Sequence, residues 1–129
     1  MTDAPPTDPT TAALASLDFF IAAFNGRDLA GVRAACNYPH VLMSGDRIII
    51  SATGDDLSLD FDDLERREGW HHSTFDDIEI MDAGPAIVDV RFNYTRYHAD
   101  GTPYFTGRAS YVFTKQDGHW GRQAQLLFN

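Results

Sequence analysis

Cysteine is nearly absent from this chain, and basic residues are few. The single cysteine, Cys36, cannot form an internal disulfide, and its place beside Ala34 and Ala35 predicts a packed small side chain rather than a nucleophile. Lys and Arg number 10 against 19 Asp and Glu, which gives a formal net charge of -9. Because such a charge repels phosphate backbones and anionic lipid surfaces, we expect neither a nucleic-acid partner nor a membrane partner.

Long hydrophobic runs are also missing. Residues 1–9 are polar and proline-rich, with no basic segment followed by an apolar run, so the sequence predicts neither a secretory signal nor a membrane span. We therefore expect a cytoplasmic protein. The acidic segment 55–68 lacks the Asp, Asn and Gly spacing of a calcium loop and is typical of a solvated helix face. We expect no metal and no cofactor.

The length of 129 residues fits one domain that buries roughly two-thirds of its unfolded surface. Asp8 followed by Pro9 is the pattern of a helix N-cap with proline at the first helical position. We therefore expect a flexible tail over residues 1–8 and a single domain over residues 9–129.

Helical sequence fills the first part of the domain. Apolar residues recur at three- and four-residue steps over residues 10–24 and predict an amphipathic helix, which Asn25 and Gly26 end. A second helix is predicted to run to about Cys36, and a short third one over residues 59–67. The first two would form a helix hairpin.

Strand sequence follows, and its apolar residues recur with a period of two. Asp100-Gly101 and Asp117-Gly118 predict tight type I′ hairpins between the last three strands. In the last strand, Arg122 lies among residues of the apolar side. Helices followed by turn-linked strands predict an α+β fold, with helices on one side of a curved, mainly antiparallel sheet that leaves a pocket. The strands are expected over residues 40–43, 47–51, 70–80, 88–95, 105–114 and 120–128.

The stretch from Phe19 to Leu29, FFIAAFNGRDL, resembles the N-terminal helix hairpin of the nuclear transport factor two-like superfamily, which includes the ketosteroid isomerases and the SnoaL-like proteins. Pro39-His40-Val41, Gly69-Trp70 and the closing DGHW are similar to its uncharacterised bacterial members. The resemblance implies a cystatin-like cone, in which the helices pack on the curved sheet and a pocket opens at one end. It also implies a homodimer paired through the outer sheet face.

The catalytic positions of the ketosteroid isomerase branch carry other residues here. Aligned through Asn25, the oxyanion-stabilising tyrosine falls at Phe20, and the general-base aspartate falls at Ser44. The second acid falls near Ala109 or Ser110. None of these side chains can take the corresponding role unaided, so isomerisation by that mechanism is not expected.

Histidines are the candidates for any acid–base chemistry. His72 and Asp76 share a parity with Ile78 and Ile80, and a functional interpretation has them enter the cone as a base and its orienting carboxylate. The alternative has His72 bonded to a backbone carbonyl and Asp76 facing solvent, and a bulge in the strand would also reverse their side. The neighbouring His71 is expected to point to the opposite face from His72, so that the two cannot chelate one metal.

His40 is a second candidate base, because it shares its parity with Ser44 at the mouth of the first strand; its alternative is a structural histidine. Phe92, Tyr94, Tyr111 and Phe113 lie on the expected inner parities and suit a small apolar or aromatic ligand. They could instead fill the core or the dimer face. Two hypotheses therefore stand: a SnoaL-like small-molecule-binding protein with lyase, isomerase or hydrolase chemistry on a pocket histidine, or a noncatalytic homodimeric ligand-binding or interaction module.

Overall fold

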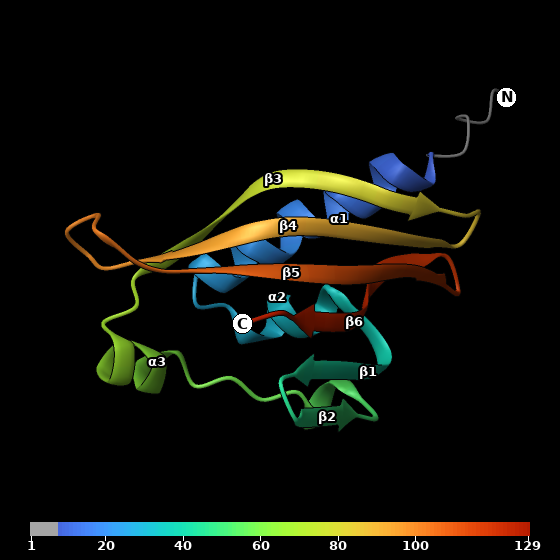
Figure 1. Ribbon diagram of the computed structural model, residues 1–129. Helices are drawn as coiled ribbons and strands as arrows, with labels where there is room; N and C mark the ends of the chain where they lie inside the picture. Colours follow the sequence, from blue (N-terminus) through green and yellow to red (C-terminus); the bar gives the residue numbers. More distant parts are fainter. Residues whose placement is uncertain (1–7) are drawn as a thin grey trace, which may run out of the picture.

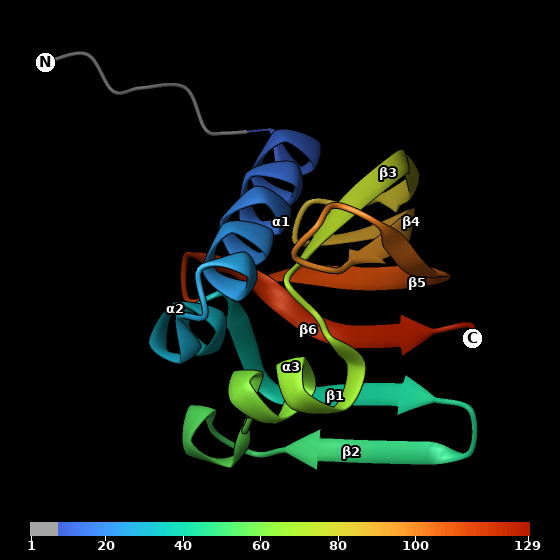
Figure 2. The same ribbon diagram turned by 90° about the vertical axis from the view of Figure 1, so that its left-hand side faces the viewer.

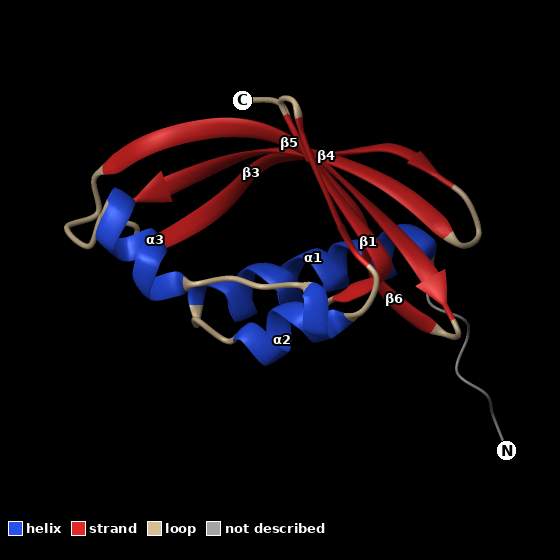
Figure 3. Cartoon of the chain, turned by 90° about the horizontal axis from the view of Figure 1, so that it is seen from below, coloured by secondary structure: helices blue, strands red, loops and turns tan. Residues whose placement is uncertain are grey.

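The computed structural model describes residues 8–129, so the predicted tail over residues 1–8 lies, apart from Asp8, outside the described part. The helices lie on one side of a curved sheet, as the α+β prediction requires (Figure 1, Figure 3). In chain order the elements are α1 (Pro9–Asn25), α2 (Leu29–Ala34), β1 (Cys36–Ser44), β2 (Arg47–Ser51), a 3-10 turn (Gly54–Asp56), α3 (Phe61–Glu68), β3 (His72–Ala83), β4 (Ile87–Tyr97), β5 (Pro103–Gln116) and β6 (His119–Leu127).

α1 begins and packs as its sequence predicts. The Asp8 side chain accepts a hydrogen bond from the backbone N–H of Thr11 at 3.1 Å, with proline at the first helical position. The helix buries Ala13, Leu17 and Phe20 against the concave side of the sheet. Among the described residues, no helix combines the length and apolar character that a bilayer crossing requires.

The second helix is shorter than predicted. It ends at Ala34, and Cys36 is the first residue of β1 rather than part of a helix. The reason is tertiary: the backbone N–H of Arg122 in β6 donates to the Ala35 carbonyl at 2.9 Å, and Cys36 pairs with Arg122 across the β1–β6 ladder. Local apolar content alone does not distinguish this buried strand start from a helix end.

The sheet has the order β2-β1-β6-β5-β4-β3, and it curls around the helices (Figure 2). Its neighbouring strands are antiparallel except for β1 and β6, which are parallel. The turn at Asp117 and Gly118 has φ of 51° and 81°, as a type I′ hairpin needs. The tight turn predicted at Asp100-Gly101 is wrong: Gly101 alone has positive φ there, and its N–H donates to the His98 carbonyl at 3.0 Å within a longer loop.

Two irregularities in the ladders decide which side chains face the concave side. In β3 the register shifts between Asp76 and Glu79, where Asp77 has φ of 53°, so an extra residue enters the strand. In the β5–β6 ladder the register shifts between Val112 and Phe113. Each shift reverses which side chains face the concave side from there to the next shift, and β3 has a further shift between Ile80 and Asp82.

The core lies between α1 and the middle of the sheet. Trp70 is fully buried, and its indole N–H donates to the Ser73 hydroxyl at 2.9 Å. Gly107 pairs with Tyr94, and a Cβ at this glycine would lie 2.6 Å from the phenol oxygen, so only glycine lets the tyrosine ring cross β5 here. The largest fully buried side chains are Trp70, Phe92, Phe113, Leu17, Val32, Val88 and Val90.

Candidate functional site

The concave side of the sheet holds two adjoining chambers of about 210 Å³ and 330 Å³. We call them the aromatic chamber and the polar chamber. Both lie beside the second half of α1, and neither is filled by the core. Five residues line both chambers and make them continuous: Phe20, Phe24, Leu42, Leu59 and Gln125.

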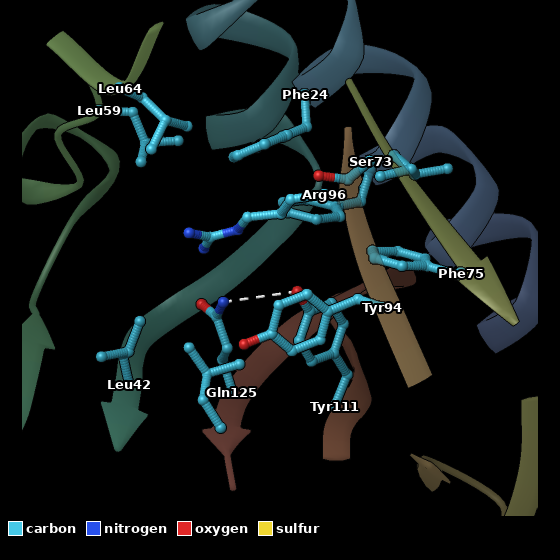
Figure 4. A pocket seen from close by; sticks show the side chains of 13 residues that line it. Phe24, Leu42, Leu59, Leu64, Ser73, Phe75, Tyr94, Arg96, Tyr111 and Gln125 are labelled. Atoms are coloured by element: carbon cyan, nitrogen blue, oxygen red, sulfur yellow. Dashed lines mark hydrogen bonds between the residues drawn. The ribbon is translucent and has the colours of Figure 1, made fainter. Parts of the chain in front are cut away.

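The aromatic chamber carries two phenols on its wall. Tyr94 donates from its hydroxyl to the Asn129 side-chain oxygen at 2.7 Å. The Tyr111 hydroxyl accepts from the Gln125 amide at 3.4 Å, a bond drawn as a dashed line in Figure 4. Burial raises the pKa of both tyrosines, so each stays a protonated donor at neutral pH. The other residues that line this chamber alone are Ile21, Leu64, Ser73, Phe75, Arg96 and Leu127.

Arg96 brings a charge to the aromatic chamber, but that charge is already paired. Its guanidinium lies 2.9 Å from the Glu68 carboxylate, which also accepts from the Tyr104 hydroxyl at 2.9 Å. Burial, together with the bond to Glu68, raises the pKa of Tyr104 to about 12. This chamber is therefore apolar and aromatic, with a neutralised ion pair at its wall.

Arg122 and His40 lie together on the wall of the polar chamber. Arg122 is only 3% exposed; its Nε donates to His40 Nε2 at 3.1 Å, and its Nη2 donates to the Cys36 sulfur at 3.6 Å. Its third nitrogen, Nη1, is buried without a hydrogen-bond partner. Within residues 8–129 no carboxylate lies within ion-pair distance of this guanidinium.

Two aromatic rings support the Arg122 side chain. The guanidinium carbon lies 4.2 Å from the centre of the Phe20 ring and 4.7 Å from that of Tyr111. Such cation–π contacts favour the charged form but do not satisfy an N–H donor. Arg122 therefore remains a buried cation whose Nη1 makes no hydrogen bond in the described residues.

His40 is kept neutral by its surroundings. Burial, and secondly the positive charge of Arg122, lower the pKa of His40 from 6.5 to about 3. Since its Nε2 accepts a hydrogen bond from Arg122, the proton of the neutral ring is assigned to Nδ1. In this state His40 orients the arginine.

The structure brings part of the predicted site together. His40, Tyr94 and Tyr111 all contribute to the chamber walls. Ser44, the last residue of β1, is half-buried and lines neither chamber. Phe92 and Phe113, expected to contact a ligand, are 1% and 0% exposed and lie in the core instead.

The expectation that His72 and Asp76 enter the cone is wrong. Ser73 and Phe75, at the alternate positions of β3, line the aromatic chamber, so His72 and Asp76 face the other way. The shift at Asp77 is the physical reason, because it breaks the parity that joined them to Ile80. The His72 ring instead stacks on Tyr97 with centroids 4.7 Å apart.

His71 and His72 do not point to opposite faces as predicted, since their Nδ1 atoms lie 3.0 Å apart. In the part of the chain that the structure describes, however, no group of three or more His, Cys, Asp and Glu side chains is arranged to hold a metal ion.

Arg122 was not among the site residues expected from the sequence, although its position among apolar residues of a strand could have indicated it. An arginine among the apolar residues of a strand indicates a buried charge that needs an explanation. The shift between Val112 and Phe113 turns Arg122 to the concave side and moves Ala124 and Leu126 to the outer face. Arg122, Ala124 and Leu126 therefore do not share one face of β6, although uninterrupted alternation along the strand predicts that they do.

No protein-family model matches this chain, and no curated protein matches it in sequence. Solved structures do match. An NTF-2-like protein of unknown function from Shewanella oneidensis is similar with a TM-score of 0.69 and 18% identity, over 93% of this chain and 98% of the other. A protein of unknown function with a cystatin-like fold from Nostoc punctiforme is similar with a TM-score of 0.74 and 10% identity, over 92% and 88%.

A third match, from Catenulispora acidiphila, was solved in complex with S-DNPA; its TM-score is 0.70 at 11% identity, over 92% of this chain and 90% of the other. These comparisons establish the cystatin-like, NTF-2-like fold that the resemblance of residues 19–29 predicted. At such low identity they establish the fold alone.

Proposed function

We propose that this protein binds a small apolar or aromatic molecule in the two chambers. The observation that carries the proposal is an unfilled space walled by rings of Phe20, Phe24 and Phe75, with the Tyr94 and Tyr111 phenols at its side. Ligand sites of proteins are commonly concave and apolar, with a few polar groups that fix orientation. A neighbour of the same fold that holds S-DNPA supports the proposal.

Binding is favoured over acid–base catalysis by His40. An effective general base needs a pKa near the working pH. The pKa of His40, at about 3, is far below neutrality, and its Nε2 is occupied by the Arg122 hydrogen bond. A lyase, isomerase or hydrolase using this histidine would first have to break that bond.

A blocked chamber tests the proposal. Leu42 lines both chambers, whereas the next residue, Met43, faces the outer side and is 37% exposed. We expect the neutral fluorophore N-phenylnaphthylamine to bind the native protein with enhanced emission. Leu42→Trp should weaken this binding about tenfold or more, because the indole occupies the shared wall, and Met43→Trp should leave it within about twofold.

The proposal fails if the fluorophore does not bind, or if both tryptophan variants bind it equally well. Thermal unfolding of each variant, followed by circular dichroism, establishes that the comparison is between folded proteins.

We also propose that two copies pair through the outer sheet face. A row of apolar side chains crosses that face from β2 toward β5, and the polar residues of β4 border it. Ile48 and Ile50 are 65% and 67% exposed. Single exposed apolar side chains are ordinary on a protein surface, but a contiguous group of them marks an interaction site. The register places the members of the row side by side: Ile48, Ile50, Val41, Met43, Ala124, Leu126 and Val112.

A further inference from the structure

Arg122 is a buried cation without an anion. A charge taken out of water is destabilising unless an opposite charge and hydrogen bonds compensate it. Here the neutral His40 ring and the Cys36 sulfur accept from two of the nitrogens, and Nη1 has no partner in the described residues. The described residues thus leave the charge and the Nη1 nitrogen unsatisfied in a side chain that lines the polar chamber.

The two arginines of the cavity differ in this respect. Arg96 pairs with Glu68 at 2.9 Å and needs nothing more. The acidic side chain on the wall of the polar chamber, Asp56, accepts hydrogen bonds from the backbone and hydroxyl of Thr53 and makes no ion pair with Arg122. The missing anion must therefore come from outside the described chain.

We infer that the ligand carries a carboxylate that pairs with Arg122 in the polar chamber, while its apolar or aromatic body fills the aromatic chamber. This inference rests on the proposed function and specifies its ligand class. One carboxylate balances one guanidinium, whereas a phosphate dianion would leave a buried negative charge. The Tyr111 ring lies 4.7 Å from the guanidinium, and its hydroxyl lies on the wall of the aromatic chamber that leads to it.

The experiment compares two probes of nearly equal size, phenylbutanoate and phenylbutanamide, which differ in charge. Calorimetric titration of the native protein at pH 7 should give the carboxylate about tenfold or more tighter binding than the amide. In Arg122→Gln that preference should fall to within about twofold. In Arg108→Gln, which removes an exposed arginine of the outer face, it should persist.

Each outcome has a distinct meaning. Equal affinity of the native protein for both probes, or a preference that survives in Arg122→Gln, overturns the carboxylate inference and leaves the proposed function standing. Absence of binding by either probe overturns the proposed function, and the inference with it.

A measurement on the native protein keeps the test independent of the variant's folding. The Nε–H resonance of Arg122 in nitrogen-15 NMR spectra should shift on addition of phenylbutanoate and move less with phenylbutanamide. An unchanged resonance at saturating phenylbutanoate overturns the inference.

Discussion

Arg122 and His40 share one buried hydrogen bond. Burial, and secondly the positive charge of Arg122, lowers the pKa of His40 and keeps the ring neutral. His40 in turn occupies the Nε–H donor of Arg122, so that this donor is not available to a ligand. A pair of this kind is expected to be costly for folding, since a buried guanidinium lacks its counterion. We interpret it as a feature kept for binding at the expense of stability.

The pH dependence of stability tests the state of His40. Its pKa is about 3 in the folded protein and 6.5 for an ordinary solvated histidine, so the unfolded chain binds more protons between these values. Stability from this group is complete above pH 6.5 and is lost as the pH falls toward 3. His40→Gln keeps an acceptor for Arg122 but does not titrate. We expect the free energy of unfolding to drop by about 2 kcal/mol less in the variant than in the native protein between pH 6.5 and 4.5.

Urea unfolding at a series of pH values measures both proteins. If the free energy of unfolding falls with pH equally in the native protein and in His40→Gln, a neutral, buried His40 is contradicted. The lowered pKa requires a larger loss of stability in the native protein.

Single residues could be predicted where strand parity was unbroken. His40, Tyr94 and Tyr111 reach the chambers as their alternation predicted. His72 was misplaced because an unmarked register shift between Asp76 and Glu79 separates it from Ile80, whose parity was used to place it. Arg122 lies directly at such a shift in β6. Parity also cannot distinguish the first layer of a cavity wall from the core behind it, which is why Phe92 was expected at the ligand.

At the scale of elements, Asn25 connects the end of α1 to β3. Its amide donates to the Ser73 carbonyl at 2.8 Å, and its side-chain oxygen accepts from the Ser73 N–H at 2.9 Å. The sequence indicated only that Asn25 ends the helix. This two-point bond sets where α1 crosses the sheet, and so the position of Phe20 and Phe24 in the chambers.

Asn25→Ala should be strongly destabilising for this reason. The substitution leaves the N–H and C=O of Ser73, a residue only 5% exposed, without partners. We expect a loss of about 2–4 kcal/mol in the free energy of unfolding. Asp18→Ala, on the exposed face of the same helix, should change it by about 0.5 kcal/mol or less. Equal losses in the two variants, measured by urea unfolding at one protein concentration, would show that the Asn25 bonds do not dock the helix.

Elements bounded by local signals were predicted well, and those fixed by distant pairing were not. Gly69, with φ of 70°, ends α3 within a residue or two of the expected position. The start of β1 depends on the parallel ladder with β6, which closes only in the folded chain. The residues around Cys36 do not by themselves indicate this pairing with β6.

For the molecule as a whole, the two faces of the sheet differ in what covers them. The concave face is covered by the helices (Figure 3) and encloses the chambers. The outer face presents the apolar row that includes Ile48, Ile50 and Met43. The fold was predictable because helix caps, breaks and turns recur in the cystatin-like cone. The proposed ligand class was not, because the proposal rests on Arg122, which lies beside a register shift that the sequence does not mark.

The proposed dimer can be tested through its apolar row. In a twofold interface each substitution acts twice, so Ile48→Glu should convert the dimer to monomer at micromolar concentration. Phe19→Glu, on the exposed face of α1, should leave it intact. Since each chain carries a net charge of -9, raising the salt concentration should strengthen native association by screening repulsion. Sedimentation equilibrium measures all three; a native monomer at every concentration, or an Ile48→Glu dimer as tight as the native one, would exclude pairing through this face.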